Sequence, residues 1–273
     1  MKFVDAHIHL SDSDYVQKVG EMIEDAKKSN VIALVSNSMD LETSHQSLRL
    51  AEEYPDQVYA ALGIHPWNTK NLPANELQET INLIHQNGEN RERVVAVGEI
   101  GLDSSYSGSG EPTETQMQVF HKLMSTAEKL SLPIIIHSRG TTSQIVSLLP
   151  SYKIKKVLLH WFSQPHSLIS KIVDHGYYIT EGPPSIFSTG IREVIRRIPL
   201  TNLMTETDGP VRFRGPFKGK MTTPAFIPTV VEAIAQLKGK EKSEVADQIF
   251  KNFTEFFGVE GVRDKRHDEG IDV

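Results

Sequence analysis

The chain has no cysteine, no long apolar run and no excess of positive charge. Without cysteine it cannot form a disulfide scaffold, a thiolate zinc site, an iron–sulfur site or a cysteine nucleophile. No stretch approaches the roughly 18 apolar residues of a membrane span, and the polar start of the sequence is not a secretion signal. We therefore expect a cytoplasmic protein with no membrane partner, in which any metal binds to imidazole and carboxylate.

The charge balance also limits the function. With 29 Lys and Arg against 35 Asp and Glu, the net charge is −6, which argues against the broad basic surface that grips a nucleic-acid backbone but leaves room for a local basic site. The 38% of hydrophobic residues are enough for a core. We predict a single domain over residues 1–260, followed by a disordered tail at 261–273 that has no apolar period.

Short runs rich in Val, Ile and Leu recur along the chain and predict buried parallel strands, because each is too short for a helix and too continuously apolar for a half-exposed strand. The predicted strands cover residues 3–9, 31–37, 58–65, 94–100, 133–137, 156–160, 177–180 and 203–208. Helical periodicity follows at 14–28, 117–130 and 223–237, and again from about residue 243.

The spacing of these strands indicates the fold class. Their ends recur about every 28 residues, close to the roughly 30 that a strand and its crossover helix require. Eight such units predict a single-domain α/β protein with a TIM (β/α)8 barrel. An open doubly wound sheet is the alternative, although no Gly-rich dinucleotide fingerprint follows the first strand.

Imidazoles and carboxylates gather at the predicted strand ends. Asp5, His7 and His9 alternate along the first strand and share one face. The other residues at strand ends are His65, Glu99, His137, His160 and Asp208. In a barrel these ends meet at the mouth where active sites lie, and burying so many polar groups without a partner would be very costly. We predict a site for Zn²⁺, Mn²⁺ or Mg²⁺ with more ligands than one tetrahedral ion needs, so two ions sharing a carboxylate would use the whole set.

Six motifs, in order from residue 3 to about residue 258, resemble the TatD-like metal-dependent deoxyribonucleases of the amidohydrolase superfamily. They are Phe3–Leu10, Gly63–Pro66, Gly98–Asp103, Ile136–Arg139, His160–Ser163 and Glu206–Pro210. The resemblance implies a TIM barrel with two divalent ions. It assigns the first ion to His7, His9, Glu99 and Asp208, and the second to Glu99 as the bridge with His137 and His160. His65 is then a second-layer or substrate-phosphate contact and not a ligand.

Three departures from the family pattern fall beside the predicted site. Ser104-Ser105-Tyr106-Ser107-Gly108 stands in place of an aromatic and basic run, Trp161 stands where a cysteine is common, and Gly209 replaces a serine. No tyrosine follows Pro210. Every expected ligand is retained, so we expect these changes to affect the substrate pocket rather than metal binding.

The chemistry implied is hydrolysis of a DNA phosphodiester by a metal-activated water, with Glu99 as the bridge and Asp208 taking or returning the proton. Arg139 is placed to bind a phosphate oxygen, and so is a basic cluster after the last strand. This cluster consists of Arg212, Arg214, Lys218 and Lys220. Trp67, Trp161 and Phe162 either stack on bases or pack the barrel rim.

Two other functions remain open. The first is a metal-dependent amidohydrolase or lactonase on the same barrel, but such enzymes often bridge their metals with a carbamylated lysine, and residues 94–99 contain no lysine. The second is a non-catalytic binding protein, which we would expect to have lost a ligand. The sequence leaves the native metal, exonuclease or endonuclease action and the oligomeric state open.

Overall fold

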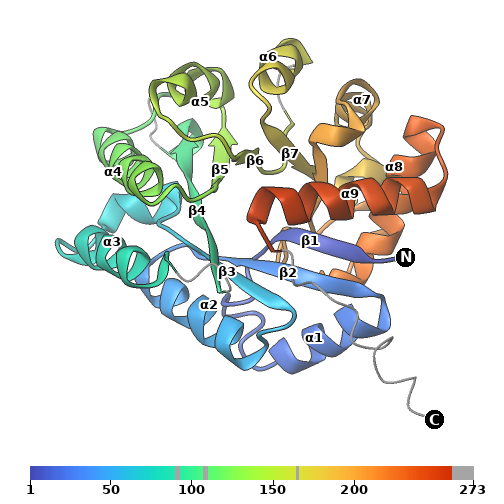
Figure 1. Cartoon of the computed structure of the whole chain (residues 1–273), viewed down its shortest axis with the longest axis horizontal. Helices are drawn as coiled ribbons and strands as arrows, with labels where there is room; N and C mark the ends of the chain where they lie inside the picture. Colours follow the sequence, from blue (N-terminus) through green and yellow to red (C-terminus); the bar gives the residue numbers. More distant parts are fainter. Residues whose placement is uncertain (90–92, 107–109, 164–165, 260–273) are drawn as a thin grey trace.

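The eight predicted strands form one parallel sheet in which each strand pairs with its neighbours in the sequence. We describe residues 1–89, 93–106, 110–163 and 166–259 from a computed structural model. The strands are β1 (Phe3–Ile8), β2 (Val31–Asn37), β3 (Val58–Leu62), β4 (Val94–Asp103), β5 (Ile134–Arg139), β6 (Val157–Leu159), β7 (Tyr178–Glu181) and β8 (Leu203–Thr205). An open doubly wound sheet would reverse its strand order at a switch point. The unbroken order β1 to β8 excludes that alternative, and the predicted barrel is confirmed (Figure 1).

The barrel closes where the chain leaves β8 and meets β1. The Asp208 N–H donates to the His7 carbonyl at 2.9 Å, and the His9 N–H donates to the Gly209 carbonyl at 2.8 Å. One step lower, the Thr205 hydroxyl donates to the Val4 carbonyl at 2.7 Å. The seam therefore fixes His7, His9 and Asp208 against one another through the backbone.

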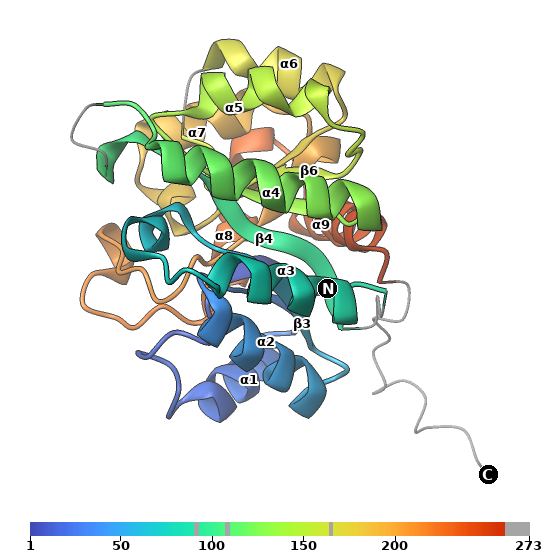
Figure 2. The same ribbon diagram turned by 90° about the vertical axis from the view of Figure 1, so that its left-hand side faces the viewer.

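Helices surround the sheet as the crossover connections (Figures 1 and 2). They are α1 (Val19–Lys28), α2 (Leu41–Glu53), α3 (Glu76–Asn87), α4 (Glu114–Leu130), α5 (Thr142–Leu148), α6 (Ile169–Asp174), α7 (Thr189–Arg197), α8 (Ile227–Lys238) and α9 (Lys242–Phe257). Short 3-10 turns add to several loops. Thr223 caps the turn Pro224–Phe226 that leads into α8, because its hydroxyl accepts the N–H of Ala225.

The first helix begins later than predicted. The periodicity places its start at Asp14, but α1 begins at Val19 because the preceding residues form turns. Tyr15 is buried in the loop and donates its hydroxyl to the Thr222 carbonyl at 2.6 Å. Tyr15 fits the apolar spacing of a helix, but it is buried because it contacts the β8–α8 loop and not because it lies on a helix face.

Several predicted strand ends are also wrong by a few residues. β4 continues past Glu99 to Asp103, because residues 100–103 pair in register with β5. β3 ends at Leu62, and His65 instead caps the 3-10 turn Pro66–Asn71. Asp208 lies three residues beyond β8 in the left-handed region, with φ of +50°, which aspartate tolerates better than most residues.

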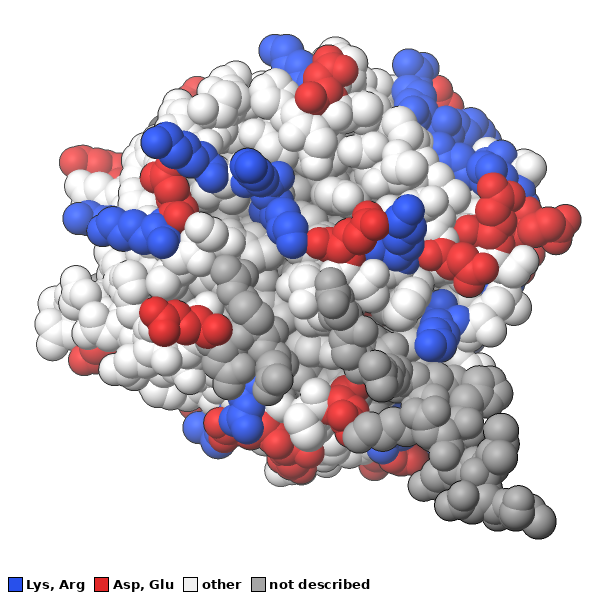
Figure 3. Space-filling model, viewed as in Figure 1, with Lys and Arg blue, Asp and Glu red and all other residues white. Residues whose placement is uncertain are grey.

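The loops that follow the strands gather on one side of the barrel, shown on the left in Figure 2, where the β8–α8 loop is drawn in orange. On the face seen in Figure 1, Lys and Arg side chains are interspersed with Asp and Glu (Figure 3). Within the described ranges, no helix is both long and apolar enough to cross a membrane. The predicted tail at 261–273 lies outside the described residues.

Candidate metal centre

The structure brings the predicted site residues together at the end of the barrel where the strands finish. β1, β4 and β5 carry His7, Glu99 and His137, respectively, while His9, His160 and Asp208 follow shortly after β1, β6 and β8. All of these residues and His65 are buried, none more than 9% exposed. Seven potential ligands from six strands and their loops therefore share one small volume.

Glu99 lies between two groups of ring nitrogens. Its Oε2 is 3.2 Å from His7 Nε2 and 3.3 Å from His9 Nε2. Asp208 Oδ1 lies 3.5 Å from each of these two nitrogens. The two histidine nitrogens are themselves 3.2 Å apart. This is the first of the two groups.

The second group faces the other carboxylate oxygen. Glu99 Oε1 lies 2.8 Å from His160 Nε2 and 3.0 Å from His137 Nδ1. His65 Nε2 lies 3.2 Å from the same oxygen. The two oxygens of one carboxylate are thus shared between separate clusters, as a bridging ligand requires.

The hydrogen bonds of the other ring nitrogens support a bound cation. His9 Nδ1 lies 3.0 Å from the Asn37 carbonyl, which can only accept, so Nδ1 carries a proton and the neutral ring has its lone pair on Nε2. That lone pair points at two carboxylate oxygens and a second imidazole nitrogen. Acceptors converging in a buried space require a positive charge among them. The nitrogen and oxygen donors suit Zn²⁺ or Mn²⁺, and the carboxylates also suit Mg²⁺.

His65 differs from the other histidines. Its Nδ1 accepts the backbone N–H of Trp67 at 3.1 Å, so the ring is neutral and its proton must be on Nε2. The Nε2–H then donates to Glu99 Oε1 and has no lone pair for a metal. This is compatible with the prediction that His65 is not a metal ligand, although its distances alone resemble those of a ligand.

The carboxylates also shift the pKa values of the imidazoles. Burial lowers the pKa of His7 and of His65 to about 4. For His9 burial acts in the same direction, but the hydrogen bonds to Asp208 and Glu99 outweigh it and raise the pKa to about 10. Burial alone would raise the pKa of Glu99, but the neighbouring imidazoles hold it well below its usual range. The carboxylates thus favour a cation at His9, and a divalent ion there must displace a proton.

Two buried carboxylates behind the ligands are site residues that the sequence analysis does not assign. Asp103 Oδ2 lies 3.0 Å from His137 Nε2. Glu206 Oε2 lies 3.5 Å from His160 Nδ1 and accepts the Thr180 hydroxyl at 2.5 Å. Asp103 and Glu206 both belong to the six motifs, so the sequence shows that they are near the site. It does not show which residues they contact, because each contact joins segments from different strands.

The arginines predicted to bind phosphate lie at the end of β5 and in the loop after β8. Arg139, Arg212 and Arg214 are exposed, and Arg212 Nη2 is 3.7 Å from Asp14 Oδ2 in the β1–α1 loop. Of the three aromatic residues, Phe162 is 1% exposed and packs in the core, so base stacking is excluded for it. Trp67 is 37% exposed, and Trp161 is partly buried with its ring centre 5.7 Å from that of Phe213.

Tyr15 provides a structural reason for Gly209. A Cβ at this position would lie 2.1 Å from the Tyr15 hydroxyl oxygen, which is held by its bond to Thr222. The glycine therefore makes room for a loop contact. Packing between two loops explains this departure from the family pattern, which the sequence analysis places in the substrate pocket.

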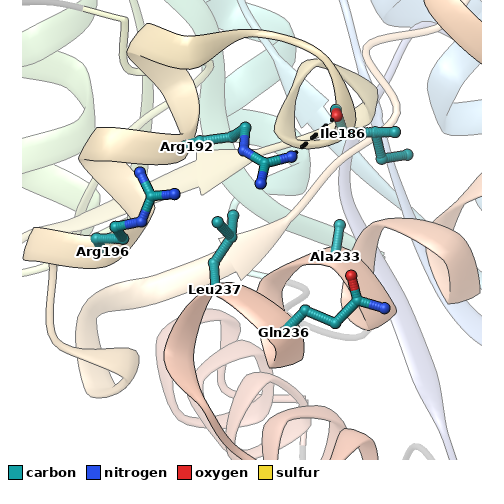
Figure 4. A pocket seen from close by; sticks show the side chains of 6 residues that line it. All are labelled: Ile186, Arg192, Arg196, Ala233, Gln236 and Leu237. Atoms are coloured by element: carbon teal, nitrogen blue, oxygen red, sulfur yellow. Dashed lines mark hydrogen bonds between the residues drawn. The ribbon is translucent and has the colours of Figure 1, made fainter.

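A separate pocket of about 230 Å³ lies in the outer helical layer, away from the histidines (Figure 4). Residues of α7, α8 and the turn before α7 line it, and Arg192 donates to the Ile186 carbonyl at 3.2 Å. It contains none of the predicted site residues.

Comparison with known proteins identifies the family of the chain. The family profile described as TatD related DNase matches residues 4–258. The human deoxyribonuclease TATDN3 is 33% identical over 263 residues, which cover 93% of this chain and 94% of the human protein. The uncharacterized metal-dependent hydrolase YabD of Bacillus subtilis is 32% identical over 259 residues, covering 93% of this chain and 98% of YabD.

A solved structure extends the agreement to the fold. YJJV, a TatD homologue from Escherichia coli, has a TM-score of 0.86 and 27% identity, and the match covers 94% of this chain and 98% of YJJV. The profile spans nearly the whole described barrel, and the curated relatives match along almost their full length. On these grounds the chain belongs to the TatD-related DNase family.

Proposed function

We propose that this metal-dependent hydrolase of the DNase family holds two divalent ions bridged by Glu99 and uses them to hydrolyse DNA phosphodiester bonds. The observation that carries the two-ion proposal is the position of Glu99. Each of its oxygens faces a separate group of ring nitrogens. His7, His9 and Asp208 would hold one ion, and His137 and His160 would hold the other.

Two ions held by these residues would supply Lewis acidity and an acidified water for an in-line displacement at phosphorus. The protein positions the groups around that chemistry. Asp208 has an oxygen among the ligands of the first group, where it takes or returns the proton of the attacking water. Its backbone is fixed by the hydrogen bond to His7, so the carboxylate is held at the seam of the barrel.

His65 is a neutral hydrogen-bond donor beside Glu99 Oε1, the carboxylate oxygen that faces away from Asp208 and the first group. Because its Nδ1 accepts from Trp67, its proton is on Nε2, and this N–H, which donates to Glu99 Oε1 in the structure, would be shared with a phosphate oxygen that enters the site. A donor held in place before the reaction stabilises charge that develops on phosphate oxygens in the transition state. The burial that keeps the ring neutral also prevents it from competing with the ions as a cation.

The phosphate backbone beyond the scissile bond would be bound by side chains at the end of β5 and in the loop after β8. Arg139, Arg212 and Arg214 are exposed there and carry no buried structural role. Lys218 and Lys220 extend the same loop and are also exposed. This local basic surface allows a chain of net charge −6 to bind a polyanion.

The rival functions fit the residues less well. The β4 strand has Glu99 at the bridging position and no lysine that could be carbamylated, which favours phosphodiester over amide or lactone hydrolysis. A non-catalytic binding protein is disfavoured because every proposed ligand is retained and has an atom within 3.5 Å of another ligand.

The test is hydrolysis by protein stripped of metal and reloaded with Zn²⁺, Mn²⁺ or Mg²⁺ in turn. We expect cleavage of single-stranded DNA, and little turnover of phosphomonoesters and lactones. Activity should be absent before reloading. Turnover of a lactone with none of DNA, in every reloaded sample, would overturn the proposed substrate class.

A further inference from the structure

Asp103, the last residue of β4, is fully buried directly behind the second group of nitrogens. Its Oδ2 accepts the Trp67 indole N–H at 2.7 Å and lies 3.0 Å from His137 Nε2. Its Oδ1 accepts the N–H of Ser105 at 2.8 Å and the Ser105 hydroxyl at 2.5 Å. The two carboxylate oxygens of Asp103 thus make four hydrogen-bond contacts, two at each oxygen.

The backbone of Asp103 is fixed as well. Its N–H donates to Gln116 Oε1 at 3.1 Å, and its carbonyl accepts from Gln116 Nε2 at 3.2 Å. Gln116 belongs to α4 and is itself buried. The carboxylate is therefore held from both its side-chain and its main-chain ends.

These contacts determine the tautomer of His137. An indole N–H and a backbone N–H can only donate, so the Asp103 oxygens that they face act as acceptors. His137 Nε2 must then carry the proton that it shares with Oδ2. The neutral ring consequently presents the lone pair of Nδ1 to Glu99 and His160.

We propose that Asp103 is a positioning residue that fixes His137 as the Nε2–H tautomer, so that His137 binds the second ion through Nδ1. This inference rests on the proposed two-ion function. It adds that Asp103 orients one of the ligands, His137, before the metal binds. A carboxylate partner fixes the ring and increases its basicity as a ligand. His9 has only a neutral backbone carbonyl, that of Asn37, in the same place.

Trp67 and Ser105 donate hydrogen bonds to the Asp103 carboxylate and so help to hold it against His137. Trp67 also supplies the backbone N–H that sets the opposite tautomer of His65. One segment of chain after β3 therefore helps make His137 a ligand and His65 a donor.

The first experiment is zinc titration of the full chain against a chromophoric chelator, with Asp103→Asn as the variant. The amide has one acceptor oxygen where the carboxylate has two, so it cannot serve both pairs of donors. We expect one of the two zinc equivalents to bind about 10- to 100-fold more weakly, with the other unchanged. Asp247→Asn, the same chemical change at an exposed position of α9, is the matched control and should bind both equivalents as the wild type does.

A double-mutant cycle distinguishes positioning from a general loss of structure. If Asp103 acts through His137, then Asp103→Asn should have no further effect on zinc affinity in a His137→Ala background. Additive effects would overturn the proposal, as would unchanged zinc affinity in a folded Asp103→Asn protein.

The second measurement uses the wild-type protein and does not depend on how the variant folds. Long-range nitrogen–proton NMR of the zinc-loaded, ¹⁵N-histidine-labelled chain should show His137 with a proton on Nε2 and zinc on Nδ1. A proton on Nδ1 would overturn the proposal. Neither measurement involves DNA, so a wild type that binds two zinc ions but cleaves no DNA would refute the proposed function alone.

Discussion

Single residues in this protein take their roles from the nitrogen or oxygen that each turns toward the centre. Glu99 is an acceptor on both sides, because ring nitrogens face each of its oxygens. His9 and His65 lie almost equally close to it, yet their outer nitrogens contact groups of opposite kind. The Asn37 carbonyl accepts from His9, whereas the Trp67 N–H donates to His65. Distance to the carboxylate alone therefore does not separate a ligand from a donor.

Replacing Glu99 with glutamine should abolish DNA hydrolysis. The amide keeps the shape but removes the charge shared between the ions, and its NH₂ group would face ring nitrogens. Since ions of this kind contribute several kcal/mol to transition-state stabilisation, we expect a loss of at least about 1000-fold in kcat. Metal content measured by mass spectrometry should fall below that of the wild type. Glu193→Gln on the surface of α7 is the control and should change neither quantity, and full activity in Glu99→Gln would contradict the account.

His65→Gln should separate catalysis from metal binding. Because His65 donates a proton and provides no lone pair, its loss should leave two ions bound while kcat falls on the order of 100-fold, as for a lost oxyanion donor. His137→Gln should by contrast lose an ion. The two variants are compared by metal content and by single-turnover cleavage of DNA. Loss of an ion in His65→Gln would show that His65 is a ligand.

At the scale of secondary-structure elements, sequence patterns predict the strands well and their ends less well. The apolar runs at 94–100 and 203–208 identify β4 and β8 but misplace Glu99 and Asp208 relative to the strand ends. A run of apolar residues predicts burial and not strand pairing. Buried residues continue past Glu99 to Asp103, and past the end of β8 into the following loop. Which of those buried residues pair with a neighbouring strand depends on register, which a single sequence does not contain.

The same limit explains Tyr15. Its spacing fits a helix face, and only the contact with the β8–α8 loop, some 200 residues later, shows why it is buried. Candidate ligands were predictable because their chemistry is rare in a buried strand. The contacts of Asp103, Glu206 and Tyr15 were not, because each depends on an element distant in sequence.

Gly209→Ala should destabilise the joint between the β1–α1 and β8–α8 loops. The new methyl group would overlap the Tyr15 hydroxyl, which cannot move without losing its bond to Thr222. We expect a loss of about 1–3 kcal/mol in the free energy of unfolding, typical of overpacking. Urea denaturation measures it. In a Tyr15→Phe background the methyl should cost clearly less, and an equal cost in both backgrounds would refute the contact as the cause.

The β8–α8 loop should supply much of the affinity for DNA. Replacing Arg212, Arg214, Lys218 and Lys220 together with alanine should weaken binding of single-stranded DNA and flatten its dependence on salt. Removal of each ion pair with a phosphate should reduce the slope of log K against log salt by about 0.7. Filter binding across a range of salt concentrations gives the slope. Alanine in place of Lys27 and Lys28 at the end of α1 is the control, and an unchanged slope in the loop variant would remove this loop from the binding surface.

At the scale of the whole molecule, the barrel gathers residues that are far apart in the sequence into one buried centre. His7 and Asp208 are 201 positions apart, yet they meet because β8 and β1 close the sheet. The fold class was predictable from the regular spacing of apolar runs, and closure is visible in the backbone hydrogen bonds that join β1 to the segment after β8. The net charge of −6 is compatible with a nucleic-acid substrate when the positive charge is local, on the ions and on one loop.

The central claim is that Glu99 bridges two ions, and anomalous X-ray diffraction from crystals of the zinc-loaded protein tests it most directly. Data collected at the zinc absorption edge should show two peaks on either side of Glu99. One peak should contact His7, His9 and Asp208, and the other should contact His160 and Nδ1 of His137. A single peak at full occupancy, or a second ion bound by His65 Nε2, would contradict the account.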